Sequence, residues 1–284
     1  MRARFVETCP VGCIAPFEAT DLVLPEGALL RCTACGQLVS QIAEDDYYRS
    51  MQAFDSAAFN LPNAHESRRR FAVARRRLDR ASKLLGTPAS APKLLDVGCS
   101  RGDFVAAAAQ LGFAAEGVEP APHIAEAARA AGRTVHTGLL EEQKLPAVRF
   151  DVVSLFEVIE HLRAPLPLLA ECKRILRPGG ILLISTGNGA SWTARAMKAR
   201  WDYFQVAKDA GHISFFNPQS MALLAARCDF EVARIETSRV KFYEKDNVPR
   251  RRYVAAKLAA EMLNVPARLT NRGHDMLVYL RVRD

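Results

Sequence analysis

Short apolar runs alternate with small-residue turns and amphipathic stretches over the middle of this chain. The first run, residues 94–97, is typical of a strand buried on both faces of a parallel sheet. Three small residues follow it, at Gly98, Ser100 and Gly102, and the Ala-rich stretch from Phe104 to Leu111 then favours a helix. A strand, a glycine turn and a helix in this order bring backbone N–H groups and the positive end of a helix close to a ligand.

The same alternation continues downstream. It predicts further strands and one helix, namely strands at Phe113–Val118, Thr134–Thr137, Phe150–Phe156 and Ile181–Ile184 and a helix at Leu166–Leu176. Strands that alternate with helices indicate an α/β domain built on a parallel sheet. Glu119 ends the second strand, where an acid can accept hydrogen bonds from two ribose hydroxyls. The pattern therefore predicts a nucleotide site at the carboxyl ends of the strands.

The run LLDVGCSRGDF at 94–104 resembles motif I of class I methyltransferases that use S-adenosylmethionine, with Ser100 in place of the middle glycine. FDVVSLF and EVIEHL at 150–162, then a helix, the turn Arg177–Gly180 and a strand, look like the fourth and fifth strands of that family. GHISFFNP at 211–218 resembles a segment of its subgroup that methylates small molecules and glycans. The resemblance covers Lys93–Thr237. It implies an α/β fold with a doubly wound, mostly parallel, seven-stranded sheet, the Rossmann-like methyltransferase fold.

The resemblance also implies which residues hold the S-adenosylmethionine cofactor. These are Asp96, Gly98, Ser100, Gly102 and Glu119 after the first two strands, Gly138 and Leu139 beside the adenine, and Leu155, Phe156 and Glu157 at the methionine half. An oxygen acceptor needs a base close to the transferred methyl group. The sequence lacks an Asn-Pro-Pro-Tyr-like tetrapeptide after the fourth strand, and this absence favours oxygen over a base nitrogen.

Two histidines are candidates for the catalytic base. His161 follows Glu160, whose carboxylate can raise the basicity of the imidazole. By resemblance to ubiquinone-pathway O-methyltransferases, His161, Glu157 and Glu160 are also a candidate Mg²⁺ site, and a third reading makes Glu160 and His161 structural. His212 follows an aromatic-rich stretch, so it either contacts the substrate or packs a lid against Phe215 and Phe216. We expect a structural role for His274.

Four cysteines stand in two pairs near the start of the chain, at Cys9, Cys13, Cys32 and Cys35. Four thiolates can close a tetrahedral zinc site, and such a site is structural because no coordination position stays open. Few large apolar residues surround these cysteines, so metal binding would supply folding free energy. We therefore expect a zinc-ribbon-like arm, with four reduced cysteines in an irregular arm as the alternative.

These features divide the chain into three predicted parts. Residues 1–45 form the zinc-ribbon-like segment, 46–90 a linker and a basic helix, and 91–284 the methyltransferase domain with insertions near 188–210 and 241–269. The first insertion carries Trp192, Trp201, Tyr203 and Phe204, which form either a substrate wall or the core of a lid.

The chain has a formal net charge of +8 at pH 7, and much of the excess is local. Seven arginines cluster in the helix predicted over His65–Leu85, namely Arg68, Arg69, Arg70, Arg75, Arg76, Arg77 and Arg80. They form either a phosphate-binding surface or, as we favour, a solvated helix face, because no aromatic residues for base stacking are interleaved.

No apolar stretch reaches the roughly 18 residues that span a bilayer, and no signal-like core follows the N-terminus. We expect a cytoplasmic location, with free thiols at Cys99, Cys172 and Cys228. The predicted function is methyl transfer to an oxygen of a small molecule or glycan. The alternatives are an RNA methyltransferase that holds nucleic acid through the ribbon and the basic helix, and a non-catalytic nucleotide-binding module. The oligomeric state stays open.

Overall fold

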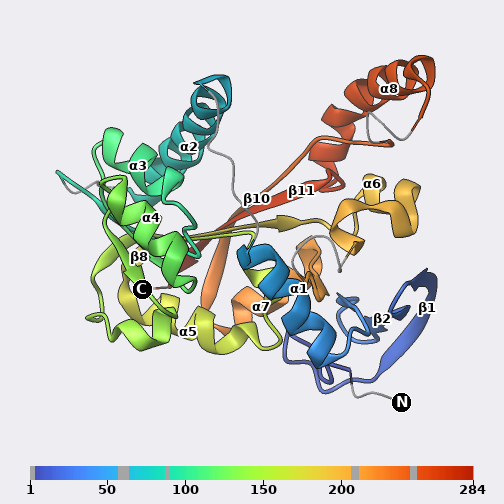
Figure 1. Ribbon diagram of the computed structural model, residues 1–284, viewed down its shortest axis with the longest axis horizontal. Helices are drawn as coiled ribbons and strands as arrows, with labels where there is room; N and C mark the ends of the chain where they lie inside the picture. Colours follow the sequence, from blue (N-terminus) through green and yellow to red (C-terminus); the bar gives the residue numbers. More distant parts are fainter. Residues whose placement is uncertain (1–3, 57–63, 87–89, 206–210, 244–247, 284) are drawn as a thin grey trace.

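The computed structural model describes residues 4–56, 64–86, 90–205, 211–243 and 248–283 (Figure 1). A seven-stranded sheet forms its centre, in the order β10-β11-β8-β7-β4-β5-β6. The strands are β4 (Lys93–Val97), β5 (Ala114–Glu119), β6 (Val135–Thr137), β7 (Phe150–Phe156), β8 (Leu176–Gly187), β10 (Phe230–Ser238) and β11 (Asp275–Val282). β11 runs antiparallel to both of its neighbours, whereas the pairs among β4, β5, β6, β7 and β8 are parallel. The predicted doubly wound, mostly parallel sheet is confirmed.

Helices cover both faces of this sheet. Alternate residues of one strand supply the two cores, since Leu94 packs on one face and Leu95 on the other. α2 (Ala64–Leu85), α3 (Asp103–Gln110) and α4 (Pro122–Ala130) lie on the first side, and α5 (Pro165–Ile175) and α7 (Pro218–Arg227) lie on the second. Short 3₁₀ turns, η1 (Leu140–Gln143) and η2 (Ile159–His161), follow β6 and β7. The carboxyl ends of β4, β5 and β7 therefore lie at one edge of the sheet, between the two layers of helices.

A second, four-stranded sheet stands beside the first, in the order β1-β2-β3-β9. Three of its strands are β1 (Phe17–Leu24), β2 (Gly27–Cys32) and β3 (Leu38–Val39), and α1 (Glu44–Ser56) follows them. The fourth, β9 (Ser214–Phe215), belongs to the GHISFFNP segment and pairs with β3 through Leu38 and Phe215. The N-terminal segment is thus joined to the larger unit by a strand from the last third of the chain.

Two predicted features differ in detail from the observed structure. The turn predicted at Arg177–Gly180 lies inside β8, where the register moves from Phe150–Leu176 to Val152–Ile181 and the extra residues form a bulge. The stretch after β8 folds as α6 (Trp192–Met197), η3 (Lys198–Arg200) and η4 (Asp202–Phe204). The later stretch contains α8 (Arg250–Leu269), which projects from the body in Figure 1. Residues 206–210 and 244–247 of these insertions, and 57–63 and 87–89 of the predicted linker, lie outside the described residues.

Within the described ranges, no helix is both long and apolar enough to cross a membrane.

Candidate active site

A cavity of about 1120 Å³ opens at the carboxyl ends of β4, β5 and β7. Most of the residues predicted to bind the cofactor line it, together with both candidate bases: Gly98, Ser100, Glu119, Gly138, Leu139, Phe156, Glu157, His161 and His212. Its volume exceeds the roughly 300–1,000 Å³ of a site for one small molecule, so it has room for a nucleoside and a second ligand. Asp96, Gly102 and Leu155 lie outside its lining, and Leu155 is fully buried in the core.

The turn after β4 forms the floor of this cavity. Gly98, Ser100 and Gly102 all have positive φ, at 70°, 48° and 73°. A Cβ atom on Gly98 would lie 2.6 Å from a methyl of Val158, so that position has no space for a side chain. Ser100 adopts the left-handed conformation that glycine would take more easily, and this explains how the turn keeps its shape without the middle glycine.

Glu119 connects this turn to the next one. Its carboxylate is nearly buried, and it accepts hydrogen bonds from the backbone N–H of Ser100 at 2.8 Å and of Ala121 at 3.0 Å. Both carboxylate oxygens are thus anchored by backbone groups, and the side chain lines the cavity. The geometry matches a carboxylate held in place to receive two hydroxyl groups.

Asp96 lies behind the turn. Its side chain is buried and accepts a 2.6 Å hydrogen bond from the Ser154 hydroxyl on the neighbouring strand β7. Burial raises the pKa of Asp96 to about 7, although the Ser154 hydrogen bond and the Arg77 charge oppose that shift. A direct contact between Asp96 and the cofactor stays a prediction, and the observed contacts support the shape of the turn.

Arg77, one of the arginines expected on the solvated face of the basic helix, instead packs behind Phe156 and does not line the cavity. Its guanidinium lies 4.4 Å from the ring centroid of Phe156, a cavity residue, and the charges of Glu157 and Asp96 attract it. The helical periodicity of α2 is the sequence signal that could have placed Arg77 correctly. Arg77 precedes the buried Leu78 and follows the buried Ala74 by three residues, so it lies near the packed face.

A carboxylate pair stands at the other end of the cavity. Glu157, with φ of 56°, accepts a 2.5 Å hydrogen bond from the Tyr203 phenol and a 3.1 Å bond from the Ser185 hydroxyl. Glu160 is fully buried. Burial raises the pKa of both carboxyl groups, and repulsion by Glu157 raises that of Glu160 further. Burial and the repulsion between the two groups therefore oppose ionisation of both carboxyl groups at once.

Both candidate bases, His161 and His212, lie close to Glu160 of this pair. The rings of His161 and His212 are 4.8 Å apart, and the Tyr203 ring stacks on His212 at 5.0 Å. Burial, with a smaller effect from His161, lowers the pKa of His212 to about 3, so His212 is neutral at physiological pH. Tyr47 of α1 lines the same cavity and donates a 2.9 Å hydrogen bond to the carbonyl of His161. Sequence reasoning missed Tyr47, because its role depends on where α1 docks.

The metal-ligand geometry here differs from the predicted Mg²⁺ set. Glu160, His161 and His212 place one ligand atom each within 4.8 Å of one another, and Glu157 is outside this group. Two imidazoles and one carboxylate suit a transition metal better than Mg²⁺, which prefers oxygen ligands. These residues therefore do not fit the Mg²⁺ ion that the resemblance implied.

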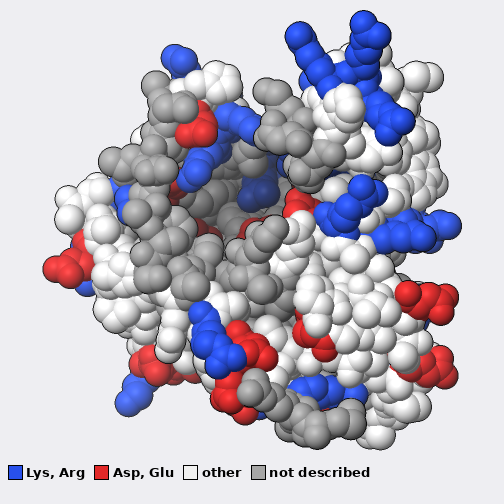
Figure 2. All heavy atoms as spheres, turned by 45° about the vertical axis from the view of Figure 1, so that its right-hand side comes forward, with Lys and Arg blue, Asp and Glu red and all other residues white. Residues whose placement is uncertain are grey.

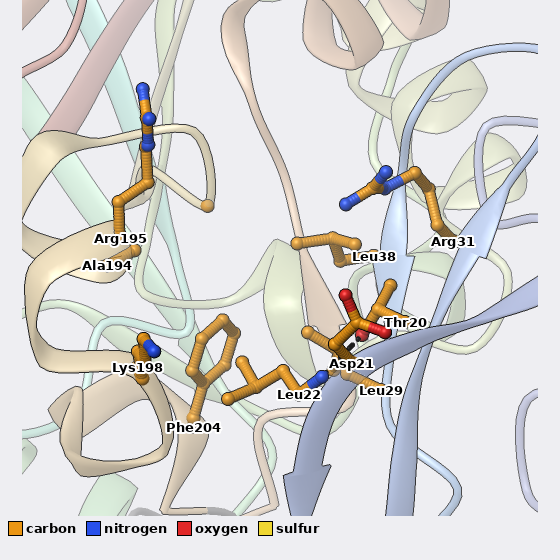
Figure 3. A pocket seen from close by; sticks show the side chains of 11 residues that line it. Thr20, Asp21, Leu22, Leu29, Arg31, Leu38, Ala194, Arg195, Lys198 and Phe204 are labelled. Atoms are coloured by element: carbon orange, nitrogen blue, oxygen red, sulfur yellow. Dashed lines mark hydrogen bonds between the residues drawn. The ribbon is translucent and has the colours of Figure 1, made fainter.

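The aromatic insertion has several roles. Tyr203 lines the cavity, whereas Trp201 is fully buried and donates its indole N–H to Nδ1 of His274 at 3.1 Å. Trp192 packs against α8. Phe204 is buried beside a second hollow of about 460 Å³ between the N-terminal sheet and α6, which Arg31, Arg195 and Lys198 border (Figure 3). Of these four aromatic residues, Tyr203 lines the cavity and the other three pack away from it, so the choice between a substrate wall and a lid core stays a prediction.

The four N-terminal cysteines meet as predicted from their spacing. Their sulfur atoms all lie within 4.8 Å of one another, and the Sγ atoms of Cys9 and Cys35 are 3.6 Å apart. A tetrahedral zinc site with Zn–S bonds of about 2.3 Å requires sulfur separations of about 3.8 Å. Arg227 of α7 contacts Gly12 and Cys13, so the cluster packs against the larger unit.

Comparison with known proteins assigns the family. Residues 66–235 match the family model described as "Methyltransferase domain". The fold is that of solved S-adenosylmethionine-dependent methyltransferases. The enzyme from Archaeoglobus fulgidus has a TM-score of 0.52 at 18% identity, with 75% of this chain and 94% of that chain covered. The enzyme from Mesorhizobium loti has a TM-score of 0.51 at 18% identity, with 71% and 96% covered. The chain belongs to the methyltransferase domain family, and the predicted class I fold is confirmed.

Curated relatives match the central region. A "Ubiquinone biosynthesis O-methyltransferase" from Cereibacter sphaeroides is 35% identical over 117 residues, which cover 38% of this chain and 47% of the relative. A protein of the same name from Haemophilus ducreyi is 36% identical over 107 residues, which cover 34% and 45%. The chain thus spans about half the length of these relatives.

Proposed function

We propose that this chain transfers a methyl group from S-adenosylmethionine to an oxygen of a small-molecule or glycan acceptor. One observation carries the proposal: a single cavity is lined both by Glu119 with its glycine turn and by the histidine and carboxylate cluster. A nucleotide-holding end and a proton-accepting end in one cavity match the needs of methyl transfer to oxygen. The names of the curated O-methyltransferases support an oxygen acceptor.

The turn residues would hold the cofactor. Glu119, fixed by two backbone N–H groups, would accept hydrogen bonds from the ribose hydroxyls. Gly138 and Leu139 would lie beside the adenine, while Phe156 and Glu157 would face the methionine half. The bound cofactor supplies an electrophilic methyl group on its sulfonium. The protein has to exclude water and to align that methyl with the acceptor oxygen.

His161 would accept the proton of the acceptor hydroxyl. Glu160 lies close to the His161 ring, and a carboxylate there would stabilise the imidazolium that forms when His161 takes the proton. His212 stays neutral beside it and, stacked on Tyr203, would fix the ring and the acceptor. His212 is therefore the positioning residue and His161 the base in this proposal.

Labelled S-adenosylmethionine tests this function. The full chain is incubated with two acceptor pools, phenols and glycans in one and total RNA in the other. We expect label in the small-molecule pool, and we expect His161→Ala to lose it without losing affinity for S-adenosylhomocysteine. The exposed His65 offers a control in His65→Ala. Label in RNA alone would assign the alternative activity, binding without transfer to either pool would indicate a non-catalytic module, and the absence of binding would overturn the assignment.

The cysteine cluster is proposed to hold one structural zinc ion. Four sulfur donors and their close approach support this assignment, because no position stays open for substrate. The zinc would fold the N-terminal sheet and hold it against α7.

A further inference from the structure

An apolar stripe faces solvent along α8. Its members are Val254, Leu258, Met262, Val265 and Leu269, with exposed fractions of 47%, 59%, 81%, 63% and 81%. Steps of four, four, three and four residues keep these side chains on one face of a helix. Large apolar side chains that gather on one exposed face mark an interaction surface, in contrast to apolar residues scattered singly.

Packing on the other side fixes the direction of this stripe. Ala260 and Ala267 are buried against Val240, and Leu263 packs into the same cluster. Asn264 accepts a 2.8 Å hydrogen bond from the backbone N–H of Val240. Because these residues hold the inner face of α8 to the body, the stripe points away from the protein and has no partner among the described residues.

Cations flank the stripe. Arg250, Arg251 and Arg252 fill the first turn of α8, which contains no acid. The positive end of the helix dipole repels them, so this placement is unfavourable for the isolated helix. Lys257 and Arg268 add positive charge, against one acid, Glu261. Blue side chains gather over the α8 end of the molecule in Figure 2.

We infer that α8 lies in the surface of an anionic lipid bilayer, with the stripe among the acyl chains and the arginines at the headgroups. An amphipathic helix with apolar residues on one face and Lys or Arg beside them binds in this way. A negative surface would also relieve the repulsion within the first turn. A second copy of the chain is a poorer occupant, because two helices that each carry five cations and one acid would repel each other. This inference stands independently of the proposed methyl transfer.

Vesicle flotation tests the inference. The full chain is mixed at physiological salt with vesicles of phosphatidylcholine alone, or with added phosphatidylglycerol. We expect binding to the anionic vesicles and at least tenfold weaker binding to the neutral ones, since each cation near the surface contributes roughly fivefold. Leu258→Glu with Met262→Glu should abolish binding, and alanine at positions 250, 251 and 252 should weaken it by more than tenfold. The matched control is Leu223→Glu, at an exposed position of α7.

Circular dichroism and affinity for S-adenosylhomocysteine show that each variant is folded. The inference would be overturned if the folded wild-type protein bound neither kind of vesicle. It would also be overturned if sedimentation showed that the wild type is a stable dimer and that the double variant Leu258→Glu with Met262→Glu is a monomer. The stripe would then bind a second copy of the chain.

Discussion

Tyr203 and Glu157, which lie 46 residues apart in the chain, meet through a 2.5 Å hydrogen bond at the wall of the cavity. Gly187 makes the approach possible, because a Cβ atom there would lie 2.6 Å from the Tyr203 ring. The same ring stacks on His212. Tyr203 therefore contacts both the carboxylate pair, through Glu157, and the histidine pair, through His212.

Tyr203→Phe should lower kcat by about tenfold or more, the usual effect of losing a hydrogen bond to a charged group. The ring remains, so the contact with His212 persists and affinity for S-adenosylhomocysteine should stay within about twofold. Steady-state kinetics and calorimetry measure the two quantities. Tyr48→Phe, at an exposed position of α1, is the control. Unchanged kcat would show that the phenol has no part in the reaction.

Glu119→Gln should weaken S-adenosylhomocysteine binding by roughly tenfold to hundredfold, because an amide oxygen replaces a charged acceptor of two hydroxyls. Glu116→Gln is a matched control on the same strand, since Glu116 pairs with His136 and Arg149 and does not line the cavity. Isothermal titration calorimetry gives both affinities. Equal affinities would place the sugar elsewhere.

Asp96→Asn should change how stability depends on pH. Burial raises the pKa of Asp96 to about 7, so between pH 4 and 7 the folded chain keeps a proton that the unfolded chain releases. This residue therefore makes the wild-type protein lose stability as pH rises through that window, by up to about 4 kcal/mol. Urea unfolding at several pH values should show that the free energy of unfolding of the variant increases relative to that of the wild type as pH rises. A difference that is constant with pH would contradict the assigned shift.

Cys32→Ser should remove the proposed zinc and lower the melting temperature, because a structural ion contributes folding free energy directly. Elemental analysis should find one zinc per wild-type chain and none in the variant. Cys228→Ser is the control, since Cys228 is buried in the larger unit away from the four clustered sulfurs. Metal-free wild-type protein with an unchanged melting temperature would refute the zinc site.

Five strands of the central sheet could be predicted from sequence because their signals are local, whereas the seven-stranded sheet as a whole was implied by the family resemblance. Leu94 and Leu95 identify a strand buried on both faces, and the spacing from Gly98 to Glu119 places two strand ends together. The cysteine cluster was also predictable, since Cys32 and Cys35 are close in sequence and four thiols suit one ion.

The remaining site residues depend on distant docking. The periodicity of α2 places Arg77 near the packed face but does not show that it meets Phe156, and nothing in the local pattern shows that Tyr47 reaches the backbone of His161. The β9 strand has two residues and pairs with Leu38 and Val39, about 175 positions away, so no periodicity reveals it.

The β3–β9 pairing has a consequence for the size of the functional unit. His212 stands two positions before β9, and β9 takes its only described β-partner from the amino-terminal sheet. A protein trimmed to the family-matching stretch would lose that anchor, along with Tyr47. We therefore expect the smallest fragment with the proposed activity to extend beyond residues 66–235, because both sheets build the end of the cavity that His212 lines.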